Sequence, residues 1–151
     1  MYDVNKIAEW FIWYNEYIRD FEDEDTDNIS NMKLQKLLFY AQSAFLAIKG
    51  KTLFNNKILA WQHGPVIKEI YEKYKDKGNQ GIIEYDEKNL KDISKEDTDL
   101  LIDVYNLFGE YSAWGLRNLT HSETPWKTTK RNEVITTDKM AEEFKKKYLE
   151  A

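Results

Sequence analysis

The fold of this chain is decided by one apolar stretch, which reads Met32-Lys33-Leu34-Gln35-Lys36-Leu37-Leu38-Phe39-Tyr40-Ala41-Gln42-Ser43-Ala44-Phe45-Leu46-Ala47-Ile48-Lys49. Most of its positions are apolar, and one face at helical spacing consists of Leu34, Leu38, Ala41, Phe45 and Ile48. Ser30 or Asn31 can cap its start, and Gly50 is a natural residue to follow its last turn. A helix that is apolar on nearly every side is expected at the centre of a domain.

Capping residues and helical periodicity predict further helices on both sides of this stretch. The first is capped by Asp3 or Asn5 and reaches about Phe21, and the later ones begin at Gly64-Pro65, Ser94, Ser112, Thr124-Pro125 and Thr137. Short apolar segments at 58–61, 81–85 and 133–136 predict extended pieces. The expected fold class is mainly α, or α+β at most: a compact single-domain helical bundle around a central apolar helix, with a small antiparallel sheet.

Length and composition indicate one cytoplasmic domain, residues 1–151. Hydrophobic residues make up 42% of the chain and aromatic residues 15%, enough for a packed core. Cysteine is absent, so disulfides and thiolate chemistry are excluded. No apolar run approaches the roughly 20 residues that span a bilayer, and the N-terminus lacks the pattern of a signal peptide. We therefore expect no membrane association.

The two histidines of the chain, His63 and His121, raise an enzymatic alternative. Together with Glu123 they could form a metal-binding triad if the fold brings them together. His121-x-Glu123 resembles part of a deaminase zinc signature, but the cysteines of that signature are absent. The acidic segment 22–28 lacks the glycine and the final glutamate of a calcium loop. We therefore expect no metal, no cofactor and no enzyme. Instead, His121 would satisfy backbone carbonyls at a helix end, and His63 would accept from a backbone N–H.

An ordered set of short motifs between Met32 and Trp126 resembles the Panacea domain of SocA-like antitoxins. The motif residues that carry this resemblance are Lys33, Gln35, Lys36, Tyr40, Gln42, Trp61, His63, Gly64, Pro65, Thr120 and His121. Gly50, the pair Leu53-Phe54 and the later Pro125-Trp126 also fit the pattern. The resemblance implies an antitoxin, a protein-binding domain that neutralises the toxin encoded beside it and that often travels on phages and mobile elements. The alternatives are an inhibitor or adaptor from a phage or mobile element that acts on a host protein, and a histidine-dependent hydrolase.

Aromatic richness supports a protein partner independently of the resemblance, because Trp and Tyr are frequent interface anchors. We expect some of six aromatic side chains to be accessible for binding: Trp10, Trp13, Tyr17, Trp61, Tyr111 and Trp126. The net charge of −5 and three dispersed arginines argue against nucleic acid as a partner of this chain by itself. Residues 1–31 hold nine acidic and two basic residues, which leaves the rest of the chain mildly basic. The sequence predicts neither the oligomeric state nor the identity of the toxin.

Overall fold

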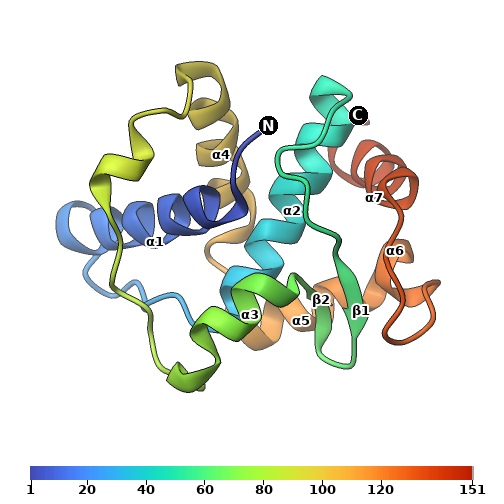
Figure 1. Cartoon of the computed structure of the whole chain (residues 1–151), viewed down its shortest axis with the longest axis horizontal. Helices are drawn as coiled ribbons and strands as arrows, with labels where there is room; N and C mark the ends of the chain where they lie inside the picture. Colours follow the sequence, from blue (N-terminus) through green and yellow to red (C-terminus); the bar gives the residue numbers. More distant parts are fainter. Residues whose placement is uncertain (151) are drawn as a thin grey trace.

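The computed structural model describes residues 1–150 and confirms a mainly helical fold with one small antiparallel sheet (Figure 1). Its helices are α1 (Val4–Phe21), α2 (Asn31–Lys49), α3 (Lys68–Tyr74), α4 (Lys95–Phe108), α5 (Ala113–Ser122), α6 (Thr124–Lys127) and α7 (Thr137–Phe144). Its strands are β1 (Leu59–Trp61) and β2 (Gly64–Val66). Short 3₁₀ helices are η1 (Lys75–Lys77) and η2 (Glu87–Leu90), and α7 runs on into a π-helical turn, η3 (Lys145–Leu149).

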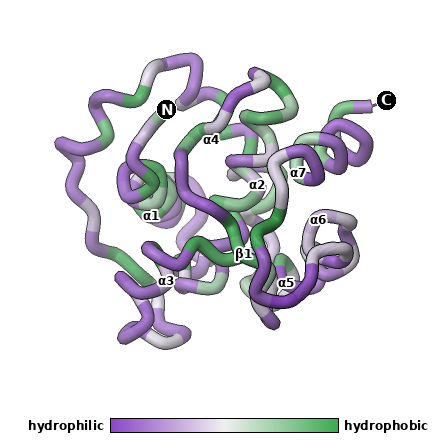
Figure 2. Tube along the Cα trace, turned by 45° about the vertical axis from the view of Figure 1, so that its right-hand side comes forward, coloured by the Kyte–Doolittle hydropathy of each residue, from purple (hydrophilic) through white to green (hydrophobic). Residues whose placement is uncertain are grey.

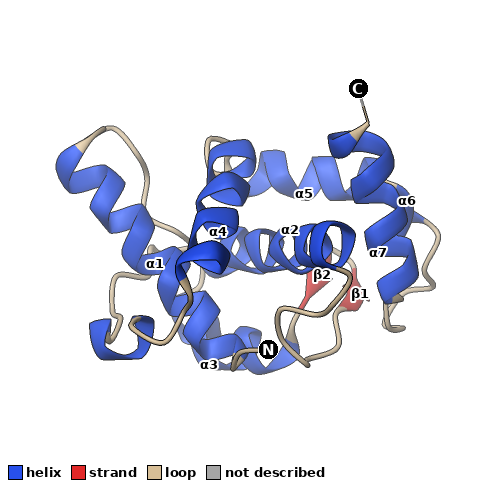
Figure 3. Cartoon of the chain, turned by 90° about the horizontal axis from the view of Figure 1, so that it is seen from above, coloured by secondary structure: helices blue, strands red, loops and turns tan. Residues whose placement is uncertain are grey.

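The central position predicted for the apolar helix is confirmed. Helix α2 is buried from Lys33 through Phe45, and it contacts α1, α3, α4, α5, α7 and β2. Figure 3 shows it in the middle of the molecule, with α5 along one side and the hairpin along another. Figure 2 shows hydrophobic residues within α1, α2 and the strands, and hydrophilic residues along much of the outer loops. Most other helices therefore complete the core by packing on α2, while α6 packs on α5 and α7.

Most helix ends form where the local sequence predicts them. The side chains of Asp3, Ser30, Ser94 and Ser112 each accept a hydrogen bond from a backbone N–H in the first turn of their helices. Gly50 follows α2 in the left-handed conformation, with φ of 71°. The last helix begins one residue early, because Thr136 rather than Thr137 caps it. At α6 the N-cap position belongs to Glu123 rather than Thr124.

The prediction of a helix that starts at Gly64-Pro65 is wrong, because these residues form strand β2. Trp61 pairs with Gly64 and Leu59 with Val66, so Gln62 and His63 make the two-residue turn of a β-hairpin. Gly64 has φ of 112°, which an L-residue rarely adopts and a helix start does not use. The third helix begins only at Lys68.

The segments 81–85 and 133–136 are not strands. Each makes a single bridge, Ile29 to Ile82 and Leu59 to Val134. Backbone bonds still join them to the fold, since Ile82 N donates to Ile29 O at 2.7 Å and Ile135 N donates to Ile58 O at 2.8 Å. Within residues 1–150, no helix combines the length and the apolar character needed to cross a membrane.

Candidate functional site

The glutamines of the α2 motif hold neighbouring segments against the central helix. Gln35 Oε1 accepts from Ile67 N at 2.8 Å, directly after β2, and its Nε2 donates to Asn31 Oδ1 at 3.0 Å. Gln42 Oε1 accepts from Leu53 N at 2.7 Å. Its Nε2 donates to Phe54 O at 2.8 Å. Both amides are buried and bonded on both ends, so they satisfy loop backbone groups that would otherwise be buried unpaired.

The two motif lysines are buried as well, but they are not equally well bonded. Lys33 Nζ donates to Gly109 O at 2.6 Å, at the end of α4. Lys36 Nζ has only a long bond, 3.4 Å, to Pro65 O. Burial lowers the pKa of Lys33, and burial followed by the charge of Arg117 lowers the pKa of Lys36 to about 7. Lys36 is therefore a weakly satisfied cation within the protein, and its charge is set by its environment near neutral pH.

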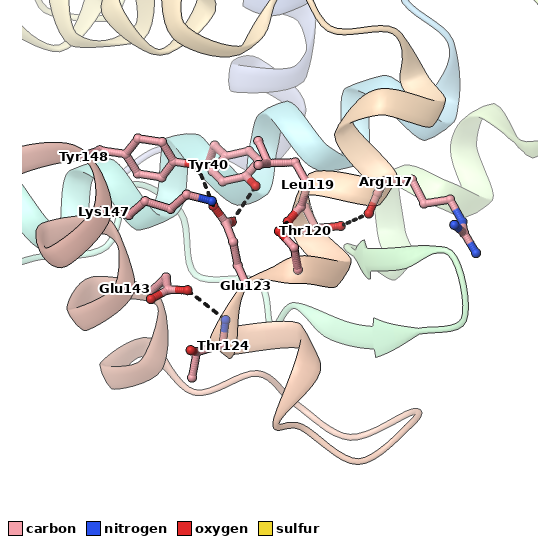
Figure 4. Close-up of polar contacts among 10 residues, drawn as sticks. Tyr40, Arg117, Leu119, Thr120, Glu123, Thr124, Glu143, Lys147 and Tyr148 are labelled. Carbon is pink, nitrogen blue, oxygen red and sulfur yellow. Dashed lines mark hydrogen bonds and ion pairs between the residues drawn. The ribbon is translucent and has the colours of Figure 1, made fainter.

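The remaining motif side chain of α2, Tyr40, belongs to a buried cluster around Glu123 (Figure 4). Glu123 is 2% exposed; its Oε1 accepts from Tyr40 OH at 2.6 Å, and its Oε2 accepts from Tyr148 OH at 2.5 Å and from Lys147 Nζ at 2.8 Å. Burial, then the Glu123 charge, raises the pKa of Tyr40, so the phenol stays protonated and donates. The cluster joins α2, the α5–α6 junction and η3.

Sequence reasoning missed this role of Glu123 and did not single out Tyr148. The feature of the sequence that could have indicated this cluster is the Tyr40 hydroxyl, because a hydroxyl on a buried helix needs a hydrogen-bond partner. The partner lies far along the chain, so no local pattern could name it. The cluster has the form of a structural hydrogen-bond network, since its donors and its carboxylate oxygens bond to one another.

Neither histidine adopts the role expected for it. His121 stacks on Trp126 with ring centroids 3.7 Å apart, and its Nε2 is buried without a hydrogen-bond partner among the described residues. Burial, followed by the charge of Arg117, lowers its pKa to about 4. His63 is exposed, and its Nδ1 accepts from the Arg117 side chain at 3.3 Å rather than from a backbone N–H. In the described part of the chain, no three His, Asp or Glu side chains cluster as metal ligands.

Burial separates the six aromatic residues expected as partner-binding candidates. Trp10 is 2% exposed and stacks on Tyr14, so it is not one of the accessible side chains: this face of α1 points into the core. Tyr17 and Tyr111 are 39% and 42% exposed. Trp13, Trp61 and Trp126 are half-buried, and Trp126 Nε1 donates to Trp61 O at 2.7 Å. An aromatic residue that was not among the candidates, Trp114, is 55% exposed.

Two of these aromatic residues, Trp61 and Trp114, line one hollow, which we call the hairpin groove. It has a volume of about 780 Å³ and lies between the start of α2, the β1–β2 hairpin, the α3–η1 segment and the start of α5. Its walls include Gln35, Lys36, Trp61, His63, Tyr71 and Trp114. Among the described residues that line it, none is Asp or Glu, although the chain carries a net charge of −5. The groove is thus a basic and aromatic recess in an acidic protein.

Comparisons with known proteins agree with the motif set on α2 and the hairpin. The family model "Antitoxin SocA-like, Panacea domain" matches residues 34–127. Antitoxin SocA of Caulobacter vibrioides is 44% identical over 55 residues, which cover 36% of this chain and 29% of that relative. The matched region thus spans less than a third of the relative's length, and no solved structure matches the chain. Because the family model covers most of the chain, including α2, the hairpin, α4, α5 and α6, the chain belongs to the SocA-like antitoxin family with a Panacea domain.

Proposed function

We propose that this chain is an antitoxin that neutralises a cognate toxin by binding it directly in the hairpin groove. The observation that carries the proposal is the groove itself, an aromatic-walled recess whose lining residues lie mostly within the segment that the family model matches. Trp114 stands at its edge, 55% exposed, and the Arg117 guanidinium lies 4.3 Å from its ring centroid. Exposed Trp and Arg beside a recess are typical of residues that contribute most of the binding energy at an interface.

A row of aromatics on α1 is a rival binding surface on the same molecule. Trp13, Tyr17 and Phe21 follow one another along the helix, with Trp13 and Tyr17 stacked 5.8 Å apart and Phe21 75% exposed. The residues of this row do not line the hairpin groove. We favour the groove because a recess buries more of an inserted side chain than a convex row does.

The test is co-expression of this chain with the protein encoded next to it, scoring growth and co-purification together. We expect the neighbouring protein alone to stop growth, and this chain to restore growth through a stable complex. Trp114→Ala should weaken the complex by about 2 kcal/mol or more, a 30-fold or greater loss of affinity, because an interface anchor is removed.

Phe21→Ala is the matched control, since it also removes an exposed aromatic ring but lies on α1. Loss of the complex in Phe21→Ala with retention in Trp114→Ala would move the binding face to α1. A harmless neighbour together with a host protein that co-purifies through Trp114 would favour an inhibitor or adaptor that acts on a host protein.

The proposed role involves no catalysis by the histidines. The His121 imidazole, with its pKa near 4, stacks on Trp126, and the exposed His63 ring is held by Arg117. A folded His121→Ala variant, which leaves the lining of the hairpin groove unchanged, should still restore growth, and its failure to do so would argue for the hydrolase. We further propose that the chain is one domain, because its core cluster includes residues from Val4 through Phe144.

A further inference from the structure

We propose that the floor of the hairpin groove is a carboxylate-binding site, which takes an acidic side chain of the protein partner together with a neighbouring apolar one. The inference rests on the proposed function for the existence of a protein partner. It adds the chemistry of the segment that enters the groove.

The first support is the position of Lys36. Its side chain comes from the central helix, is 1% exposed, and ends beside Gly64 and Thr120: a Cβ built on Gly64 would lie 2.7 Å from Lys36 Cε. An ammonium group has three donors, yet among residues 1–150 Lys36 Nζ bonds only to Pro65 O at 3.4 Å. Lys36 is also among the residues that line the groove, so a ligand held there lies next to this side chain.

The second support is the absence of a counter-charge around this ammonium in the described structure. Arg117 lowers the pKa of both Lys36 and His121, and Lys36 itself lowers that of His121. On the hairpin side the ionisable neighbour is His63, and at the far wall it is Lys75. These groups come from α5, the hairpin turn and η1, and all of them are basic.

The buried acid that directly follows α5, Glu123, is already engaged. Its two carboxylate oxygens accept from Tyr40, Tyr148 and Lys147 on the side of α2 that faces η3. A buried cation without an opposite charge is costly, so a ligand that supplies one carboxylate gains an interaction that the free protein lacks.

The walls determine what should accompany the carboxylate. Trp61, Val66, Tyr71 and Trp114 line the groove with apolar surface, and the Trp61 and Tyr71 rings meet edge-on, 5.0 Å apart. Such a recess fits an apolar side chain next to the acid. The acidic charge of the whole chain disfavours a polyanion such as nucleic acid, whereas one buried ammonium suits one carboxylate.

A proton linkage follows from the same geometry. In the free protein the pKa of Lys36 is about 7, so the amine is largely neutral above that pH. A bound carboxylate favours the charged form and raises this pKa. Binding above pH 7 must therefore take up a proton, and the affinity should fall as the pH rises from 7 to 9.

The test uses the full chain and a small probe that does not depend on any toxin. The probe is N-acetylphenylalanine, a carboxylate with an apolar ring; its amide, which lacks the charge, is the control. Carbon-13 NMR of labelled lysines follows Lys36 Cε, and the indole N–H signal of Trp114 follows the groove. We expect the acid to move both signals and raise the pKa of Lys36, and the amide to have at most a small effect.

Variants assign the effect to the ammonium. Lys36→Met should abolish the response of Trp114 to the acid, while Lys51→Met, at an exposed lysine that does not line the groove, should keep it. Equal responses to the acid and the amide, or none to either, would overturn the carboxylate site. Stronger binding of inorganic phosphate, with displacement of the acid, would overturn it in favour of a phosphate-bearing ligand.

The complex with the protein partner provides a second test of the carboxylate site. For a complex that forms with wild-type protein, calorimetry at pH 7 and 9 should show proton uptake at the higher pH and a roughly tenfold or greater loss of affinity in Lys36→Met. A complex unchanged by Lys36→Met would overturn this inference and leave the antitoxin proposal standing. Absence of any complex, with the probe still bound at Lys36, would instead contradict the antitoxin proposal.

Discussion

Burial sets the charge state of Lys36, which lies in the second turn of the central helix. The unfolded lysine titrates near 10.5, whereas the folded one has a pKa of about 7. Between these values the unfolded chain binds more protons, so the contribution of Lys36 to stability rises with pH across this window and is lowest below pH 7. At neutral pH, Lys36 therefore destabilises the folded state of this protein.

Lys36→Met should therefore stabilise the fold. We expect a gain of about 1–3 kcal/mol at pH 6.5, because replacing a buried charge with an apolar side chain of similar size is often favourable. The gain should shrink by about 2 kcal/mol at pH 8.5, because the unfolded chain binds nearly one more proton than the folded chain across most of this range. Urea unfolding at both values checks this, with Lys75→Met as the control for loss of an exposed lysine. A gain that does not depend on pH would contradict the titration of Lys36.

Gly64 is required by both its backbone angle and its close approach to Lys36. Gly64→Ala should cost about 2 kcal/mol or more in the free energy of unfolding, since an L-residue is strained at φ of 112° and its Cβ would meet Lys36 Cε. Gly50→Ala is a matched control, because its φ is 71° but nothing lies within 4 Å of the added carbon. Equal losses in chemical unfolding of the two variants would mean that the contact with Lys36 carries no cost.

Separate elements are joined through the Glu123 cluster. Tyr40 lies on α2, Glu123 caps the α5–α6 junction and Tyr148 belongs to η3, while the Tyr40 ring stacks on Phe108 of α4 at 3.9 Å. One carboxylate therefore fixes the C-terminal turn against helices formed much earlier in the chain.

Tyr40→Phe should cost about 1.5–3 kcal/mol, the range for a hydrogen bond to a charged group, because Glu123 Oε1 loses its donor in a buried site. Hydrogen exchange of 145–149 should accelerate as η3 loosens. The comparison is Tyr17→Phe, whose side chain is 39% exposed and which should change stability by less than about 0.5 kcal/mol. Unfolding curves that coincide for the two variants would argue against the cluster as a tether.

The whole molecule is larger than its family-matched segment, residues 34–127. Helices α1 and α7 lie outside that segment, yet both contact α2 and contribute core residues such as Ile7, Phe11, Met140 and Phe144. Without them, two sides of the central helix would face water.

A fragment of residues 34–127 should therefore fail to fold cooperatively. Each buried side chain of this size contributes about 1.5–3 kcal/mol, so losing several removes most of a net stability of about 5–15 kcal/mol. Circular dichroism during heating should show a sharp transition for the full chain and a gradual change for the fragment. A sharp transition in the fragment would mean that the core is complete without α1 and α7.

The sequence alone determined the central helix, its ends and the fold class. These depend on local properties: the spacing of apolar residues along α2, the Ser30 hydroxyl at its start, and the freedom of Gly50 at its end. The candidate site was only half visible in the sequence. Trp61 and His63 were named among its residues, but Trp114 was not, because its local pattern also fits a core position of α5.

Only the tertiary structure decided the hairpin, the groove and the charge of Lys36. Gly64-Pro65 fits a helix start as well as a strand, and the choice depends on Gln35, which binds the backbone after β2 from another element. Trp10 likewise faces the core rather than a partner because α1 packs on α2. Local sequence fixes backbone angles and helical period, whereas burial and pairing depend on residues brought together from distant parts of the chain.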